Sequence, residues 1–349
     1  VPRETVEEVN DVLRSRFIGQ GPRVEQFEKE FSELFKVPHV VSLNSGTAAL
    51  ETAYDLIGLK AGDEVISTPL TCTATNLPLI RRGVKIVWAD VLEETLCIDG
   101  NDVLTKLTDK TKSIVQVHLG GIQAYVPKID TIPVISDACQ ALGIFTGDYT
   151  CCSFQAIKHI TTGDCGMLVL NTANSERDRN NSRLLRWFGI DRNKKIKNNW
   201  QAYTQRAMTF DIKLPGTKRH MTDIAAAMGL VGLRYYNQVI EHRKKIFNIY
   251  KNELKGMDGI RLVDGDVNTY WLATVIVEKR DDFAKMLFEG DVDNNLVQVR
   301  NDVYKIFGGK RADLPVLNKL EGKYISIPLN MKTTEEDAHY ITKLIKGGW

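Results

Sequence analysis

Short apolar runs that alternate with helix-like intervals constrain the fold of this chain more than any other feature of its sequence. Several intervals between the runs, such as 47–56 and 74–82, have helical spacing. Alternation of this kind is typical of a mainly parallel sheet with helices on both faces. The sequence therefore predicts an α/β three-layer sandwich around a seven-stranded sheet, with strands at 40–43, 65–68, 86–89, 114–118, 133–136, 151–154 and 167–170.

The length of 349 residues is ample for a large domain and a smaller one. Beyond Tyr235 a long helical stretch leads to an apolar strand at 270–277. We therefore expect a large domain over 1–235, which includes the N-terminal helices, and a smaller C-terminal α+β domain over 236–349.

Two helix starts show the capping-box pattern, a hydroxyl residue followed three positions later by an acid. Thr5 with Glu8 predicts the start of the first helix. Thr334 with Asp337 predicts the start of a helix over 333–346.

Composition narrows the class of protein. The net charge of +2 gives no argument for nucleic-acid binding. No apolar run reaches membrane-spanning length, and no signal-peptide pattern opens the chain. The six cysteines lack metal-ligand spacing, so we expect no metal site and a reducing, cytoplasmic location. The segment 177–219 is strongly basic, which fits either a solvated surface or a pocket for a nucleotide diphosphate.

A single lysine, Lys158, lies among small and polar residues just after the predicted strand at 151–154. Its amine is a nucleophile only when neutral, and partial burial favours the neutral form, so Lys158 is a candidate for a Schiff base. The alternative is an ordinary solvated lysine at a strand end.

Two further groups support a catalytic site. Asp137 ends the apolar run at 133–136, and the carboxyl end of a strand in an α/β protein faces the ligand crevice. Ser45, Gly46 and Thr47 lie where a strand turns into a helix, and free amides and hydroxyls there suit a phosphate. We call Ser45, Gly46 and Thr47 the phosphate seat. The seat, an acid that can bind a pyridine nitrogen and a lysine follow one another in the sequence, and together they predict a pyridoxal phosphate site.

The chain resembles the DegT/StrS family of sugar aminotransferases, which have the aspartate aminotransferase type of fold. The resemblance rests on six motifs in family order: Gly19-Gln-Gly-Pro22, Ser45-Gly-Thr-Ala-Ala-Leu50, Thr71-Cys-Thr-Ala-Thr-Asn76, Asp137-Ala-Cys-Gln140, Ser153-Phe154 with Lys158 and Ile160-Thr-Thr-Gly163, and His220-Met-Thr-Asp-Ile224.

The resemblance assigns further cofactor contacts. It implies that Gln140 binds the ring hydroxyl and that Ser153 binds the phosphate. It places Cys72 against the ring face, where the family often has an aromatic residue; a small buried cysteine on a tight turn is the alternative. It also implies an obligate homodimer with shared sites, in which Lys218 and His220 reach the partner's cofactor phosphate.

Substrate contacts are implied less directly. Arg192 ends the segment that resembles the family's Arg-x-x-Gly-x-x-Arg pattern, and Arg300 lies in a segment near the family's substrate; a structural salt bridge is an equal alternative for Arg300. His159 is a further candidate substrate contact. Some family members are sugar dehydratases with a histidine at the Schiff-base position, but the alignment places Lys158, and not His159, at that position. His118, at a predicted strand end, is better explained as a structural polar group.

The implied activity is transfer of an amino group from glutamate to a keto sugar on a nucleotide diphosphate. The acceptor implied by the resemblance is a 4-keto-6-deoxyhexose, which would give a perosamine-type amino sugar. A sugar dehydratase on the same scaffold is one alternative. A catalytically silent dimer is another, and Cys72, Asp164 and Cys165, which depart from the family pattern, are the residues that favour it.

Overall fold

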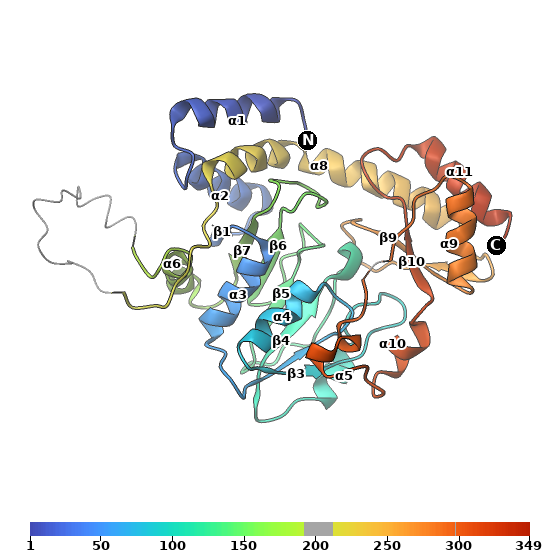
Figure 1. The fold of residues 1–349 in the computed structure, drawn as a ribbon, viewed down its shortest axis with the longest axis horizontal. Helices are drawn as coiled ribbons and strands as arrows, with labels where there is room; N and C mark the ends of the chain where they lie inside the picture. The colour runs from blue at the N-terminus through green and yellow to red at the C-terminus, as the bar shows by residue number, and fades with distance from the viewer. Residues whose placement is uncertain (192–211, 297) are drawn as a thin grey trace, which may run out of the picture. The chain divides into compact units, whose positions relative to one another are not determined.

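The computed structural model describes residues 1–191, 212–296 and 298–349 (Figure 1). They form two compact units, each built from separate stretches of the chain. The first unit consists of Val1–Gly58 and Asp148–Leu233, and the second of Leu59–Gly147 and Arg234–Trp349. The domains expected over 1–235 and 236–349 remain a prediction.

The seven predicted strands all form, within a few residues of their expected bounds. They belong to one sheet with the order β1-β7-β6-β5-β4-β2-β3. The α/β fold predicted from the alternation is therefore confirmed. The strands are β1 (Val40–Leu43), β2 (Glu64–Ser67), β3 (Lys85–Trp88), β4 (Thr111–Val117), β5 (Val134–Asp137), β6 (Tyr149–Ser153) and β7 (Gly166–Leu170).

The first unit contains the strands β1, β6 and β7, of which β7 runs antiparallel to both of the others. The segment 154–165 joins β6 to β7 through turns and without a helix, and a connection of this kind suits a reversal of direction. Helices of this unit are α1 (Glu4–Ser15), α2 (Pro22–Phe35), α3 (Gly46–Ile57), α6 (Ser175–Leu185) and the start of α8 (Asp223–Glu253).

An aromatic cluster forms part of the core of the first unit. Phe27 and Phe31 of α2 are buried, as their helical spacing predicts, and the ring of Phe154 packs edge-on against both, with centroid distances of 5.4 and 6.1 Å. Phe154 is the first residue after β6. The core therefore fixes the start of the segment that contains Lys158.

The second unit contains β2 to β5, in which β2 pairs in parallel with β3 and β4, and β4 with β5. It also contains an antiparallel three-stranded sheet, β10-β9-β8, which agrees with a smaller α+β part. Its remaining elements are α4 (Thr73–Arg81), α5 (Gly100–Thr105), β8 (Ile260–Leu262), β9 (Ala273–Val277), α9 (Arg280–Glu289), α10 (Pro315–Leu320), β10 (Tyr324–Ile327) and α11 (Glu335–Lys346).

Of the two predicted capping boxes, the structure confirms the one at Thr334 and not the one at Thr5. Thr334 caps α11, because its hydroxyl accepts from the backbone N–H of Asp337 and the Asp337 carboxylate accepts from the backbone of Thr334. The box at Thr5 is wrong. The helix α1 already begins at Glu4, after an Arg3 of helical geometry, so Thr5 lies inside the first turn and is buried.

Among the residues that the structure describes, no helix is both long and apolar enough to cross a membrane.

Candidate active site

Lys158 lies on the segment between β6 and β7, and local hydrogen bonds fold this segment back on itself. The N–H of Thr162 donates to the carbonyl of Phe154 at 2.9 Å, and the N–H of Lys158 donates to the carbonyl of Gln155 at the same distance. Lys158 itself is half-buried. The lysine therefore occupies a defined turn rather than an open loop.

Packing fixes the segment on both sides of Lys158. Phe154 belongs to the aromatic cluster of the core. Ile160 is buried against α8 at Gly232, where an added Cβ would lie only 2.9 Å from the Cβ of Ile160. Since the anchors lie four residues before and two residues after Lys158, they restrict the positions that its backbone can adopt.

Cys165 closes the segment in an unusual backbone conformation. Its φ angle is 81°, in the left-handed region that favours glycine. Its N–H donates to the carbonyl of Asn44 at 3.1 Å, and its own carbonyl accepts from the N–H of Phe154 at 2.9 Å. Burial raises the pKa of its thiol to about 11, so Cys165 stays protonated at neutral pH.

The predicted phosphate seat lies at the start of α3, a helix of 12 residues. Ser45 is the N-cap, and its hydroxyl oxygen accepts from the N–H of Ala48 at 3.0 Å. Gly46 and Thr47 form the first turn, where backbone N–H groups point out of the helix. These amides, the positive end of the helix dipole and the hydroxyls fit an anionic phosphate.

Ser153 and the phosphate seat meet around Gly166. Ser153, the last residue of β6, pairs with Gly166 at the start of β7. A Cβ on Gly166 would lie 2.6 Å from the carbonyl oxygen of Ser45 and 2.7 Å from the nitrogen of Gly46. Only a glycine allows this close approach of strand and helix. The structure thus brings together three of the predicted phosphate ligands.

The turn that contains Lys218 and His220 also approaches the seat. The N–H of Asn44, next to Ser45, donates to the carbonyl of Arg219 at 2.7 Å. The Lys218 ammonium lies 5.9 Å from the centroid of the Trp187 ring, and the His220 ring packs edge-on against the same indole at 4.5 Å. The backbone of the turn therefore lies near the seat of its own chain, whereas both side chains contact Trp187.

Two further residues, His159 and Arg192, are candidate substrate contacts on sequence grounds. His159 is only 5% exposed. Arg192 lies outside the described residues.

In the second unit, Asp137 ends β5, as predicted, and is 5% exposed. Its Oδ2 accepts from the hydroxyl of Thr75 at 2.7 Å, and its Oδ1 accepts from the N–H of Cys139 at 3.1 Å. Two hydrogen bonds of this kind hold a carboxylate in one orientation. Asp137 has the chemistry required to bind a protonated pyridine nitrogen.

Gln140 and Cys72 also belong to the second unit. The side-chain oxygen of Gln140 accepts from the N–H of Gly120 at 2.8 Å, which orients the amide. Cys72 precedes α4 and is exposed, so the alternative of a small buried cysteine does not describe it.

His118 is a structural residue, as expected. It is fully buried; its Nδ1 accepts from the N–H of Ala124 at 2.9 Å, and its Nε2 lies 3.1 Å from the Thr146 hydroxyl. Burial lowers the pKa of His118 to about 3. The imidazole is therefore neutral at physiological pH, with its proton on Nε2.

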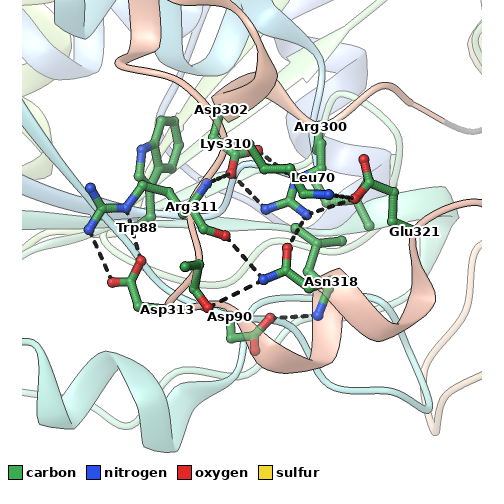
Figure 2. Close-up of polar contacts among 12 residues, drawn as sticks. Leu70, Trp88, Asp90, Arg300, Asp302, Lys310, Arg311, Asp313, Asn318 and Glu321 are labelled. Carbon is green, nitrogen blue, oxygen red and sulfur yellow. Dashed lines mark hydrogen bonds and ion pairs between the residues drawn. The ribbon is translucent and has the colours of Figure 1, made fainter.

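Arg300 forms the salt bridge that was its structural alternative (Figure 2). Its side chain is 2% exposed, and two of its nitrogens each lie 2.6 Å from an oxygen of Asp302. A third nitrogen donates to the Asn318 side chain at 2.6 Å. With its guanidinium engaged in this way, Arg300 is not included in the substrate site proposed below.

Thr75 contacts Asp137, and Asn301 contacts the loop before α4, but neither residue was predicted to belong to the site. The motif Thr71-Cys-Thr-Ala-Thr-Asn76 contains the threonine. No sequence pattern pairs it with an asparagine near residue 300.

A family model and several known proteins match most of this chain. A model of the DegT/DnrJ/EryC1/StrS aminotransferase family matches residues 2–346. The chain is 29% identical to the spore coat polysaccharide biosynthesis protein SpsC of Bacillus subtilis, over 99% of this chain and 94% of the relative. It is also 29% identical to the GDP-perosamine synthase of Vibrio cholerae, over 82% of this chain and 79% of the relative.

Solved structures are similar over almost the whole chain. The sugar aminotransferase CalS13 from Micromonospora echinospora superposes with a TM-score of 0.89 at 28% identity, covering 100% of this chain and 98% of the other. The PLP form of a putative sugar aminotransferase, Spr1654 from Streptococcus pneumoniae, superposes with a TM-score of 0.88 at 25% identity, covering 99% and 96%.

The fold is thus that of the sugar aminotransferases, a class of enzymes whose structures include a PLP form. The chain belongs to the DegT/DnrJ/EryC1/StrS aminotransferase family.

Proposed function

We propose that the protein is a pyridoxal phosphate-dependent aminotransferase that moves an amino group from glutamate to a nucleotide-diphosphate-linked keto sugar. The observation that supports this most strongly is the half-buried Lys158, held in a defined turn by Phe154 and Ile160. Lysine, and not the neighbouring histidine, occupies this turn position, which favours transamination over dehydration.

The resemblance to the family assigns the cofactor contacts that we propose. Ser45, Gly46, Thr47 and Ser153 would hold the phosphate through hydroxyls and first-turn amides. Lys158 would hold the aldehyde carbon of the cofactor, and its amine, when free, would serve as the acid and base of the reaction.

Asp137 would bind the protonated ring nitrogen, Gln140 would bind the ring hydroxyl, and Cys72 would lie against the ring face. When bound, pyridoxal phosphate supplies the electron sink for the reaction. The oriented carboxylate of Asp137 would keep the ring nitrogen protonated, which this chemistry requires.

The acceptor that we propose is a 4-keto-6-deoxyhexose. The support is the similarity to the GDP-perosamine synthase of Vibrio cholerae. We also propose a cytoplasmic homodimer with shared sites, in which Lys218 and His220 serve the partner's cofactor. The six cysteines are all free, which suits a reducing location.

The experiment is a spectrum followed by a product assay. Purified protein with added pyridoxal phosphate should show a visible band that glutamate converts to that of the aminated cofactor, and a keto sugar nucleotide should then restore the first band and gain an amine, detected by mass. Lys158→Ala should lose both responses, whereas Lys60→Ala, a variant of an exposed lysine, should keep them. A band that ignores glutamate would favour the dehydratase alternative, and no band would favour a silent dimer.

A further inference from the structure

A directed chain of hydroxyls ends on Asp137. The Thr75 hydroxyl lies 2.7 Å from Oδ2 of Asp137, and the Thr71 hydroxyl lies 2.8 Å from that of Thr75. An ionised carboxylate only accepts, so Thr75 donates to Asp137, and its oxygen is left to accept from Thr71. All three residues are buried. Hydrogen bonds aligned in one direction polarise and strengthen one another in such surroundings.

The loop that carries Thr71 depends on a distant residue. Asn301 donates its backbone N–H to the carbonyl of Pro69 and its side-chain amide to the carbonyl of Thr71, both at 2.7 Å. Its side-chain oxygen accepts from Asn76 of α4 at 2.9 Å, across 225 residues of sequence. Asn301 is fully buried. It therefore contacts the loop before α4 and, through Asn76, the helix on which Thr75 lies.

The residues on both sides of Asn301, Arg300 and Asp302, are held by polar contacts (Figure 2). Arg300 and Asp302 form the buried bidentate ion pair, and the N–H of Arg311 also donates to Asp302 at 2.9 Å. Asn318, which accepts from Arg300, lies on α10. The first N–H groups of that helix donate to Asp90 at 2.8 and 2.9 Å. The Asn301 backbone is thus fixed from several sides.

We propose that Thr75 is a positioning residue for Asp137 and that Asn301 acts through it, by holding the loop and helix that present the Thr75 hydroxyl. The proposal rests on the proposed function, because it takes Asp137 to be the partner of the cofactor's ring nitrogen. It adds that the orientation of Asp137 depends on Asn301, a residue that touches neither cofactor nor substrate.

The first test compares Thr75→Val with Thr75→Ser. Valine keeps the shape and removes the donor to a charged group, so the dissociation constant for pyridoxal phosphate should rise about tenfold. The pH midpoint of the visible band should also shift. Thr75→Ser should restore both values to within about twofold of wild type. The matched control is Thr342→Val, which removes a buried hydroxyl that donates to a backbone carbonyl in α11, remote in sequence from the site; it should bind the cofactor as wild type does.

A double-mutant cycle tests the role of Asn301. Asn301→Ala should weaken cofactor binding in the same direction as Thr75→Val. If Asn301 acts through Thr75, the double variant should bind no more weakly than Thr75→Val alone. Additive losses of cofactor affinity would show that Asn301 does not act through Thr75 and would overturn that part of the proposal.

The outcomes separate this inference from the proposed function. Suppose that wild type gains the visible band and that Thr75→Val has the same dissociation constant for the cofactor and the same pH midpoint of the band. The positioning role of Thr75 is then wrong, and the proposed function stands. If Thr75→Ser fails like Thr75→Val, the hydroxyl is not what matters and the role is again wrong. A wild type without any band removes both proposals.

Discussion

At the scale of single residues, Cys165 shows how the Lys158 segment is closed. Cys165 departs from the family pattern, which usually has glycine at this position, and its φ angle of 81° lies in the region that favours glycine. A left-handed backbone costs about 1–2 kcal/mol for a residue with a Cβ. Cys165 adopts it where its N–H contacts Asn44, beside the predicted phosphate seat. A cysteine at this position therefore adds backbone strain that a glycine would not.

This strain predicts an inverted order of stability for two variants. Cys165→Gly should be more stable than Cys165→Ala by about 1 kcal/mol, because only alanine retains a Cβ in the left-handed region. At an ordinary position alanine is the more stable of the two. Urea unfolding of both variants measures the difference, and an alanine variant of equal or higher stability would contradict the strain.

A pH-dependent stability follows from His118. Burial lowers its pKa in the folded protein to about 3, so between pH 3 and 6.5 the unfolded chain binds the additional proton. The contribution of the buried neutral imidazole to the free energy of unfolding is fully present above pH 6.5 and is lost as the pH falls towards 3. Between pH 7.5 and 5.5 this residue should remove about 1.4 kcal/mol of the free energy of unfolding.

The control for this prediction is His118→Asn, which is less stable at neutral pH but lacks the titrating group. Urea unfolding of wild type and variant at the two pH values isolates the effect, since other titrating groups are common to both. Equal losses of stability in wild type and variant would show that His118 is not buried in its neutral form.

At the scale of elements, Thr334 should contribute measurably to α11. Its hydroxyl satisfies an N–H at the helix start that otherwise has no partner in the helix. Thr334→Ala should lower the free energy of unfolding by about 1 kcal/mol, whereas Thr334→Ser should change it little. Denaturant unfolding of the two variants provides the measurement. An alanine variant as stable as the serine variant would contradict the cap.

The two capping boxes also show what the sequence predicts about elements. Thr5 and Thr334 share one pattern, but only Thr334 caps, since α1 begins before Thr5. A local pattern is compatible with a helix start at both residues, and the surrounding residues determine where each helix begins. The apolar runs located the strands of the seven-stranded sheet but not β8 or β10. The antiparallel direction of β7 was also not predicted, because the direction of a strand depends on how its connection folds.

At the scale of the whole molecule, the order of motifs predicted the family and the roles of residues close to each motif. It did not predict the contact of Asn301 with Thr71 and Asn76, since residues so far apart leave no periodic signal. A structural salt bridge at Arg300 was one of two alternatives, but the sequence did not identify Asp302 and Asn318 as the partners of Arg300, for the same reason. Periodicity and motifs report local structure, whereas these buried polar contacts depend on the completed fold.

The proposed dimer with shared sites predicts complementation between two inactive variants. Lys158→Ala lacks the nucleophile, and Lys218→Ala lacks the residue proposed to reach the partner's site. A dimer formed from one chain of each has one site with both lysines, so an equal, re-equilibrated mixture should regain about a quarter of the wild-type activity. Product formation before and after mixing measures this. Sites built within one chain would regain none.

Lys158 should bind pyridoxal phosphate covalently, and chemical reduction of the bound cofactor onto its lysine can detect this bond. The protein loaded with the cofactor is reduced with borohydride, digested and analysed by mass spectrometry. The account predicts that the added mass of the reduced cofactor lies on Lys158 and disappears if glutamate is added before reduction. A modification confined to another lysine, or none in a protein that otherwise folds and binds the cofactor, would contradict it.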